Sequence, residues 1–246
     1  MNIHSVTGFL SPALAWVAPL RCVVCSRPVE AHLRWPLCAA CAAELSVHAG
    51  RRCIICGKPI VSELVRCMRC RTSASGFDGA FPLYSYTGVA RSLLRAYKVK
   101  KRKSLASFLS QCLATEITAR FPGYTIVPVP PRPGKIRREG WDQVALLAGF
   151  LQRNWNLPVA RILARLKGGD EQKTLDREGR RTNVMGRYTL LPGGIRAEGR
   201  NSIARVPRKI LLLDDIMTTG ATLSECASVL KGHGGEMVYA MVIAAD

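Results

Sequence analysis

The segment from Ile210 to Thr222, with the sequence ILLLDDIMTTGAT, is the feature that most constrains the fold. Four apolar residues in a row are typical of a strand that is buried on both faces of a parallel sheet. Two acids, Asp214 and Asp215, follow at once, and a small loop rich in hydroxyl groups then opens a predicted helix. A strand that passes through such a loop into a helix indicates an α/β domain with alternating strands and helices.

The loop after this strand has the composition of a phosphate-binding site. At a helix N-terminus, backbone N–H groups, hydroxyls and the helix dipole stabilise a phosphate monoester. Gly220 lets the backbone approach the ligand closely. We place Asp214 and Asp215 just outside the carboxyl end of the strand, where open α/β sheets bind ligands, and expect them to accept hydrogen bonds from a sugar diol. The loop residues are Thr218, Thr219, Gly220, Ala221 and Thr222.

The rest of the C-terminal region also alternates between the two periodicities. Strand-like stretches cover 77–86, 125–131, 209–213 and 237–244, and helical spacing covers 89–97, 105–120, 141–153 and 222–231. The order predicts a mostly parallel sheet in a three-layer α/β domain. A change in composition near residues 73–76 places a boundary between this domain, 76–246, and an N-terminal part, 1–75.

The N-terminal part holds nearly all of the cysteines. Eight of the ten lie between residues 22 and 70 and form four Cys-x-x-Cys pairs. Each pair presents two thiolates at one turn, and two pairs complete a tetrahedral Zn²⁺ site with no open position, which favours a structural role. The simplest assignment is sequential, with Cys22, Cys25, Cys38 and Cys41 in one site and Cys53, Cys56, Cys67 and Cys70 in the other.

The spacing leaves an interleaved pairing open, and disulfides or redox dithiols are the alternatives to a metal. In a chain of 246 residues, such crowded pairs are more typical of metal sites in a reducing compartment than of a secreted scaffold. We therefore expect about two structural zinc ions in a pair of zinc ribbons that need metal to fold. Cys112 and Cys226 lie in helical apolar patterns and are expected in the core.

No run of 18 apolar residues occurs, so no transmembrane helix is expected. The apolar stretch 9–20 has no Lys or Arg before it, which favours a helix packed on the zinc ribbons over a signal peptide. We expect a cytoplasmic protein and leave open a peripheral contact with the inner face of the membrane.

The chain is strongly basic, with 36 Lys and Arg against 17 Asp and Glu, and this charge favours phosphorylated or polyanionic partners. From Gly88 to Gln111 there are seven basic residues and no acid. Such a run can follow a nucleic-acid backbone, and a nearby aromatic such as Tyr97 could stack on bases of a single strand. A solvated loop is the alternative. The predicted nucleic-acid contacts are Lys100, Lys101, Arg102 and Lys103.

Residues 210–222 match the phosphoribosyl pyrophosphate (PRPP) signature of type I phosphoribosyltransferases. More widely, the chain resembles the ComF family of competence-associated phosphoribosyltransferase-like proteins. The resemblance covers nearly the whole chain in matching order. It rests on the Cys pairs with Cys56-Gly57-Lys58-Pro59, the helix ending at Lys98, Val127-Pro128-Val129-Pro130, Gly140-Trp141-Asp142-Gln143, Gln172, Leu175, Arg180, Asn183 and the PRPP loop.

The resemblance implies a type I phosphoribosyltransferase fold in which the loop 218–222 holds the 5′-phosphate. Asp214 and Asp215 would contact the ribose as the catalytic candidates, with Mg²⁺ bridging ribose and pyrophosphate. The turn at 127–131 would be the pyrophosphate loop. Glu139 and Asp142 stand where many family members carry Arg and Asn, and they add negative charge beside this turn. Further expected PRPP contacts are Lys98, Pro130, Arg132, Lys135 and Arg180.

Three functions are compatible with these features. The leading hypothesis is a ComF-like protein that binds PRPP with Mg²⁺ and single-stranded DNA during DNA uptake or natural transformation, alongside partners such as a ComF-type helicase. Phosphoribosyl transfer by this protein is left open. The second is a nucleobase phosphoribosyltransferase of nucleotide salvage, and the third is a PRPP-responsive binding protein without turnover.

Overall fold

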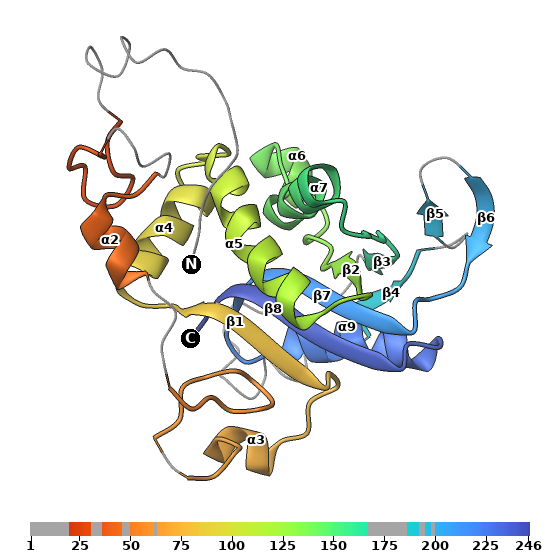
Figure 1. Cartoon of the computed structure of the whole chain (residues 1–246). Helices are drawn as coiled ribbons and strands as arrows, with labels where there is room; N and C mark the ends of the chain where they lie inside the picture. Colours follow the sequence, from red (N-terminus) through yellow and green to blue (C-terminus); the bar gives the residue numbers. More distant parts are fainter. Residues whose placement is uncertain are drawn as a thin grey trace.

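A four-stranded parallel sheet forms the centre of the molecule (Figure 1). The computed structural model describes residues 20–30, 36–45, 50–61, 63–166, 186–191, 195–197 and 200–246. The sheet runs in the order β1, β8, β7, β2, so β7 and β8 lie at its centre. The strands are β1 (Gly79–Ser85), β2 (Thr125–Pro128), β7 (Lys209–Met217) and β8 (Met237–Ala245).

Helices cover both faces of this sheet because the side chains of each strand alternate between two apolar clusters. Leu211 and Leu213 of β7 point into one cluster, and Ile210 and Leu212 point into the other. The first face is covered by α4 (Gly88–Lys98), α5 (Leu105–Arg120) and α7 (Gln143–Trp155), and the second by α9 (Ala221–Gly232). The expected α/β fold class, with a mostly parallel sheet between helices, is confirmed.

Most of the predicted elements are present with small changes at their ends, and the largest change is in β7. This strand continues to Met217, and its Asp214 pairs in register with Val242 of β8. Asp214 and Asp215 therefore lie within the last residues of the strand, rather than just outside it as expected. The last part of β7, after residue 213, was not predicted because two acids interrupt the apolar run.

Several short elements were not predicted, because three to five residues carry too little periodicity to be recognised. The β3–β4 and β5–β6 pairs are both antiparallel. These elements are α6 (Lys135–Glu139), β3 (Leu163–Arg165), β4 (Tyr188–Leu190), β5 (Ile195–Ala197) and β6 (Arg200–Ala204).

The two Cys-rich units pack against different faces of the sheet. The first unit includes α2 (Ala39–Glu44), and its Cys22, Cys38 and Cys41 share an apolar cluster with α4 and α5. The second includes α3 (Met68–Thr72), and its Cys53 and Cys56 share the other cluster with Phe77 and α9. The division of the chain at residues 75/76 stays a prediction. Each zinc ribbon is nevertheless part of a continuous core with the α/β region.

The second ribbon also covers an edge of the sheet. The Ala80 N–H of edge strand β1 donates to the Ile55 carbonyl at 2.7 Å, and the Arg52 guanidinium donates to the Pro82 carbonyl at 2.9 Å. Covered edges do not pair with other chains. Among the described residues, no helix is long and apolar enough to span a membrane. The apolar stretch 9–20 lies almost wholly outside them.

Candidate functional site

Each set of four cysteines comes together as the sequential assignment predicts. In both sets the four sulfur atoms all lie within 4.8 Å of one another. The Sγ atoms of Cys25 and Cys38 are 3.6 Å apart, and those of Cys56 and Cys67 are 3.7 Å apart. A Zn–S distance of about 2.3 Å places the corners of a tetrahedron about 3.8 Å apart, so both sets have the dimensions of a zinc site.

The thiol groups are free, and no cysteine forms a disulfide in the described chain. Backbone N–H groups point at the sulfur atoms, as Cys67 N does at Cys53 Sγ, 3.3 Å away. Two four-cysteine sites therefore fit two structural zinc ions, and the interleaved pairing is excluded. Cys112 and Cys226 belong to neither set and lie in α5 and α9, with Cys226 fully buried.

The acidic pair lies at the carboxyl end of β7, beside the carboxyl end of β2. The chain leaves β7 toward α9 on one face of the sheet and leaves β2 toward α7 on the other. Strands whose helices lie on opposite faces open a crevice between them, which is the usual ligand site of open α/β sheets. The Val129 N–H donates to the Leu213 carbonyl at 2.9 Å and holds the turn after β2 against β7.

The two acids have different surroundings. Asp215 forms an ion pair with Lys98, whose Nζ is 2.8 Å from the Asp215 Oδ2, and the Asp215 side chain is only 10% exposed. Burial, together with the negative charge of Asp215, raises the pKa of Asp214 to about 7. A largely buried pair of acids with cations nearby is an arrangement typical of binding or catalytic sites. Lys98 is the last residue of α4, and its role as a PRPP contact stays a prediction.

Gln143, the first residue of α7, links this helix to α4 and α6. It is buried, and its Oε1 accepts a hydrogen bond from Lys135 Nζ. Tyr97 in α4 donates its hydroxyl hydrogen to the Gln143 carbonyl at 2.8 Å, and the Tyr97 and Trp141 rings meet edge to face. This arrangement fixes Lys135 near the charge of Asp214, which Lys135 partly offsets.

The loop 218–222 forms a turn at the N-terminus of α9. Gly220 has a φ of 77°, a left-handed conformation that side chains with a Cβ rarely adopt. The Ala221 N–H points at Thr219 Oγ1, 3.3 Å away, and the Ser224 N–H donates to the Gly220 carbonyl. These bonds shape the start of the helix, where N–H groups favour an anion.

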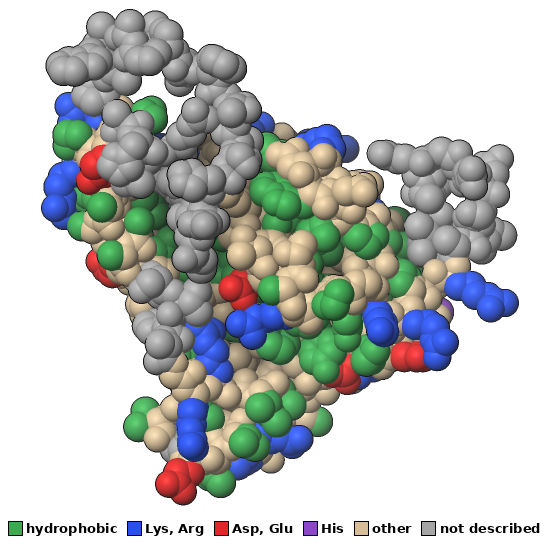
Figure 2. Space-filling view, in the orientation of Figure 1, with side chains coloured by type: hydrophobic (Ala, Val, Ile, Leu, Met, Phe, Trp, Pro, Cys, Tyr) green, Lys and Arg blue, Asp and Glu red, His purple; other side chains and the backbone are tan. Residues whose placement is uncertain are grey.

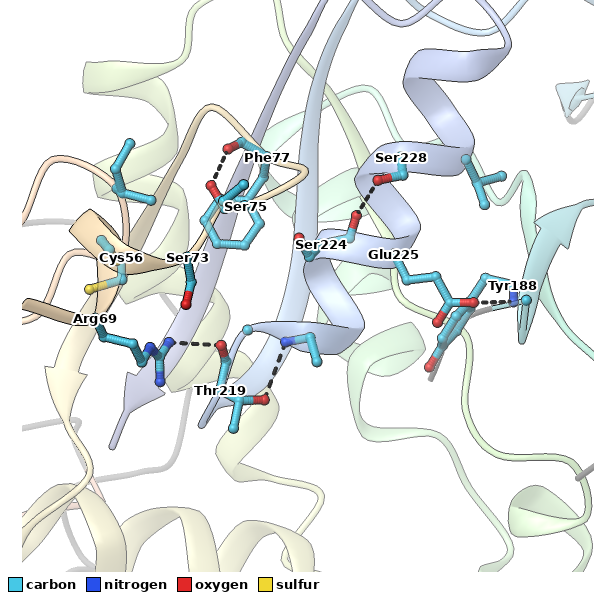
Figure 3. Close-up of a pocket in the computed structure, with 17 residues that line it drawn as sticks. Cys56, Arg69, Ser73, Ser75, Phe77, Tyr188, Thr219, Ser224, Glu225 and Ser228 are labelled. Carbon is cyan, nitrogen blue, oxygen red and sulfur yellow. Dashed lines mark hydrogen bonds between the residues drawn. The ribbon is translucent and has the colours of Figure 1, made fainter. Parts of the chain in front are cut away.

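The second zinc ribbon contacts this loop directly. Arg69 of α3 donates from Nη2 to the Thr219 carbonyl at 2.7 Å (Figure 3). It also donates from Nη1 to the Thr218 carbonyl at 3.2 Å. A cavity of about 630 Å³ lies between the ribbon and α9, lined among others by Arg69, Phe77, Tyr188 and Glu225. The sequence does not point to Arg69, because the residue lies about 150 positions from its partners and fills a non-ligand position of a Cys-x-x-Cys pair.

The remaining predicted PRPP contacts are placed as follows. Pro130 is half-buried and Arg132 is exposed, and both lie in the turn between β2 and α6. Arg180 lies outside the described residues, as do Gln172, Leu175 and Asn183 of the family resemblance. Thr218 is exposed and Thr222 is half-buried at the start of α9.

The two acidic departures from the family have structural partners. Asp142 is the N-cap of α7, where its Oδ1 accepts hydrogen bonds from the Val144 and Ala145 N–H groups at 2.9 and 3.2 Å. Asn caps helices in the same way, so the substitution retains the cap. Glu139 faces Gln143 Nε2 at 3.5 Å and Arg138 at 3.6 Å. These contacts therefore partly offset the negative charge of both acids.

The basic run forms the connection between α4 and α5. All four predicted nucleic-acid residues are exposed, and Lys103 Nζ lies 5.8 Å from the centre of the Trp141 ring. The connection begins directly after Lys98, which pairs with Asp215, so the exposed cations lie close to the acidic pair along the chain. The four residues are Lys100, Lys101, Arg102 and Lys103.

The fold and these sites define a class of protein in which two four-cysteine units are joined to an α/β domain with a parallel sheet. Residues 13–71 match the family model of the double zinc ribbon domain. A solved hypoxanthine phosphoribosyltransferase from Staphylococcus aureus aligns with 57% of this chain and 62% of its own, at 13% identity and a TM-score of 0.33. This likeness is too loose to add to what the sheet and loop show.

Among curated proteins, the chain is similar to proteins of DNA uptake and use. Competence protein F of Haemophilus influenzae is 24% identical over 225 residues, which cover 88% of this chain and 86% of the relative. DNA utilization protein YhgH of Escherichia coli O157:H7 is 26% identical over 89% of this chain and 94% of the relative. Competence protein ComFC of Streptococcus pneumoniae is 29% identical over 63% of each chain. The predicted resemblance to the ComF family is confirmed.

Proposed function

We propose that this protein binds PRPP with Mg²⁺ in the crevice after β7 and acts on single-stranded DNA during DNA uptake. The observation that carries the first part is the placement of Asp214 and Asp215 beside a helix N-terminus, with Lys98 already at hydrogen-bonding distance. An anion site next to two carboxylates is complementary to a sugar phosphate, since the phosphate and the hydroxyls of one molecule can occupy both. The names of the curated relatives support the second part.

The parts of PRPP match the order of groups along the crevice. The 5′-phosphate would accept hydrogen bonds from the N–H and hydroxyl groups of 218–222, and the ribose diol would donate to the two acids. Lys98 and Lys135 would then face the pyrophosphate. Lys98 would leave its ion pair with Asp215 and contact the pyrophosphate oxygens instead. Mg²⁺ favours oxygen ligands and substrate phosphates, and the carboxylates meet that preference.

Calorimetric titration of Mg²⁺·PRPP into the wild type and Asp215→Asn tests this proposal. We expect the wild type to bind and the variant to lose at least about ten-fold in affinity, because the substitution removes a charged hydrogen-bond acceptor. Glu116→Gln is the matched control, since Glu116 lies on α5 and pairs with Arg120 at the helix surface. Absence of binding to zinc-loaded wild type would contradict the proposal.

Release of pyrophosphate separates a transferase from a binding protein. In the proposed geometry the residues position PRPP and stabilise charge, and a nitrogen nucleophile would displace pyrophosphate from C1′. A screen of nucleobases with Mg²⁺·PRPP would give pyrophosphate only if the salvage hypothesis holds. PRPP binding without release over the whole panel would support a PRPP-responsive binding protein.

For the DNA part, the exposed cations between α4 and α5 are the proposed contact. Phosphate contacts make binding weaken as salt rises, by an amount that scales with the number of contacts. Replacing the four cations by Ala is expected to weaken single-strand binding and to flatten its salt dependence by up to about three units of slope, at about 0.7 per contact. Unchanged affinity and slope would show that the contact lies elsewhere.

A second quadruple variant controls for total charge. Its positions are also exposed cations, and two of them, Arg120 and Arg208, lie near the amino ends of the strands, away from the crevice. This variant removes the same charge and is expected to retain the salt slope. It replaces Arg120, Arg153, Arg161 and Arg208 by Ala.

A further inference from the structure

We propose that Arg69 is a positioning residue of the phosphate site, through which the second zinc ribbon sets the affinity for 5′-phosphorylated ribose. The inference rests on the PRPP site proposed above and assigns part of its affinity to a different region of the chain. It starts from the two hydrogen bonds that Arg69 donates to the Thr218 and Thr219 carbonyls.

The orientation of the peptide planes connects these bonds to the ligand. In a trans peptide the C=O and the N–H of one plane point in opposite directions. The carbonyls of Thr218 and Thr219 point to Arg69, so the N–H groups of Thr219 and Gly220 point away from the ribbon. In the part of the chain that the structure describes, neither N–H donates a hydrogen bond to another residue. Arg69 therefore holds two free donors in the loop proposed for the 5′-phosphate.

Arg69 is itself held in place on both sides. It lies between the zinc-ligand candidates Cys67 and Cys70, in the five-residue helix α3. The chain that leaves the ribbon is joined to α9 by the Gly76 N–H, which donates to Ser224 Oγ, and a Cβ on Gly76 would lie 2.3 Å from the Ser224 carbonyl oxygen. This close approach holds the chain next to the ribbon against α9, the helix that the loop opens.

The same apolar cluster extends from the ribbon to the loop. Cys53 and Cys56 are buried together with Met217 and Leu223, which flank the loop on its two sides. The Phe77 ring lies 3.5 Å from the position of a Cβ on Gly220. By contrast, the first ribbon touches the start of α4, where the Glu44 carboxylate faces the Val89 N–H. Lys98 lies nine residues further along, about 14 Å away at 1.5 Å per residue.

The test compares Arg69→Ala with Arg71→Ala, which removes an exposed guanidinium from the same helix. Calorimetry with ribose 5-phosphate, Mg²⁺·PRPP and inorganic pyrophosphate separates the parts of the ligand. Arg69→Ala is expected to weaken ribose 5-phosphate and PRPP by the same factor, about ten-fold, and to leave pyrophosphate binding unchanged. Arg69→Lys is expected to recover part of the loss, because an ammonium can donate to one carbonyl at a time.

Hydrogen exchange provides a readout that needs no ligand. In the free protein, the Ala221 and Ser224 amides, which donate to Thr219 Oγ1 and to the Gly220 carbonyl, are expected to exchange at least about five-fold faster in Arg69→Ala than in Arg71→Ala, with two zinc ions retained in both. Equal exchange in the two variants, or equal losses for ribose 5-phosphate and pyrophosphate, would overturn the inference. Failure of the wild type to bind PRPP would contradict the proposed function, and the exchange rates would still decide whether Arg69 orders the loop.

Discussion

The two zinc ribbons share one ligand pattern but differ in what surrounds it. In the first ribbon, Leu37 and Leu45 are buried against α4 and α5. The second ribbon contributes Arg69 to the phosphate loop, and Figure 2 shows hydrophobic and basic side chains side by side on its lobe. Its exposed large hydrophobic residues are Ile54, Val61, Leu64, Val65 and Met68.

This difference shows that repetition of a metal motif does not repeat its role. The first ribbon contributes to the stability of the helical face through burial. The second adjoins the proposed ligand site and contributes less apolar burial of its own. Loss of the first ribbon should therefore act mainly on stability, and loss of the second mainly on binding.

Removal of the zinc sites one at a time should have the largest effect. We expect Cys22→Ser/Cys25→Ser and Cys53→Ser/Cys56→Ser each to lose one of two zinc ions, because each removes two of the four thiolates of a site. The effect is large because structural zinc supplies about 10 kcal/mol of folding free energy to small ribbons. Only the second double variant is expected to lose PRPP binding. Native mass spectrometry counts the ions, and calorimetry measures the affinity.

Hydrogen exchange of α5 shows whether the α/β region of each double variant stays folded. If α5 remains protected and both variants lose PRPP affinity equally, the distinction between the ribbons is wrong. The same conclusion follows if the first double variant alone loses affinity.

A matched pair of leucines tests the difference in burial. Leu37 in the first ribbon is fully buried, whereas Leu64 in the second is 50% exposed. We expect Leu37→Ala to lower the free energy of unfolding by about 2–4 kcal/mol, the usual cost of a buried cavity, and Leu64→Ala by less than about 0.5 kcal/mol. Urea denaturation measures both values. Equal costs would mean that the two ribbons contribute alike to stability.

The crevice beside the second ribbon should show the smallest effect, as a dependence of stability on pH. Because the folded state raises the pKa of Asp214 to about 7, the stability contributed by its protonated form is present below pH 4 and lost as the pH rises through 7. Asp214→Asn should therefore stabilise the free protein by about 1–3 kcal/mol at pH 8 and by about half as much at pH 5.5, which lies midway between the two pKa values. Thermal unfolding at the two pH values checks this.

The matched control for this measurement is again Glu116→Gln, because Glu116 pairs with Arg120 at the surface of α5. Its effect on stability should be small and nearly the same at both pH values. If the stability change of Asp214→Asn is also the same at both pH values, Asp214 is ionised in the free protein without a loss of folding stability.

Much of the fold could be predicted from local patterns. The apolar run that begins at Ile210 marked β7, and the periodicity of 105–120 matched α5 to the residue. The zinc ligands were recognisable because a Cys-x-x-Cys turn places two thiolates by local geometry alone. The strands β3 to β6 were missed because each is too short to show a period.

The candidate site was predictable only in part. The loop 218–222 and the two acids form a continuous segment, so their proximity follows from the chain itself. The ion pair between Lys98 and Asp215 joins elements more than a hundred positions apart, and the family resemblance implied a PRPP contact for Lys98 but no pairing. Arg69 had no signal at all, because an arginine between two metal ligands looks like any other surface cation.

By itself, the sequence determined the order of strands and helices, the residues of two four-cysteine sites and the phosphate-loop segment, since turns, helix starts and knuckles depend on neighbouring residues. Only the tertiary structure decided the sequential pairing of the cysteines, the packing of each ribbon on a different face of the sheet, and the contact between Arg69 and the loop. These depend on how apolar faces far apart in the chain pack together, and that packing brings Arg69 within hydrogen-bonding distance of Thr219.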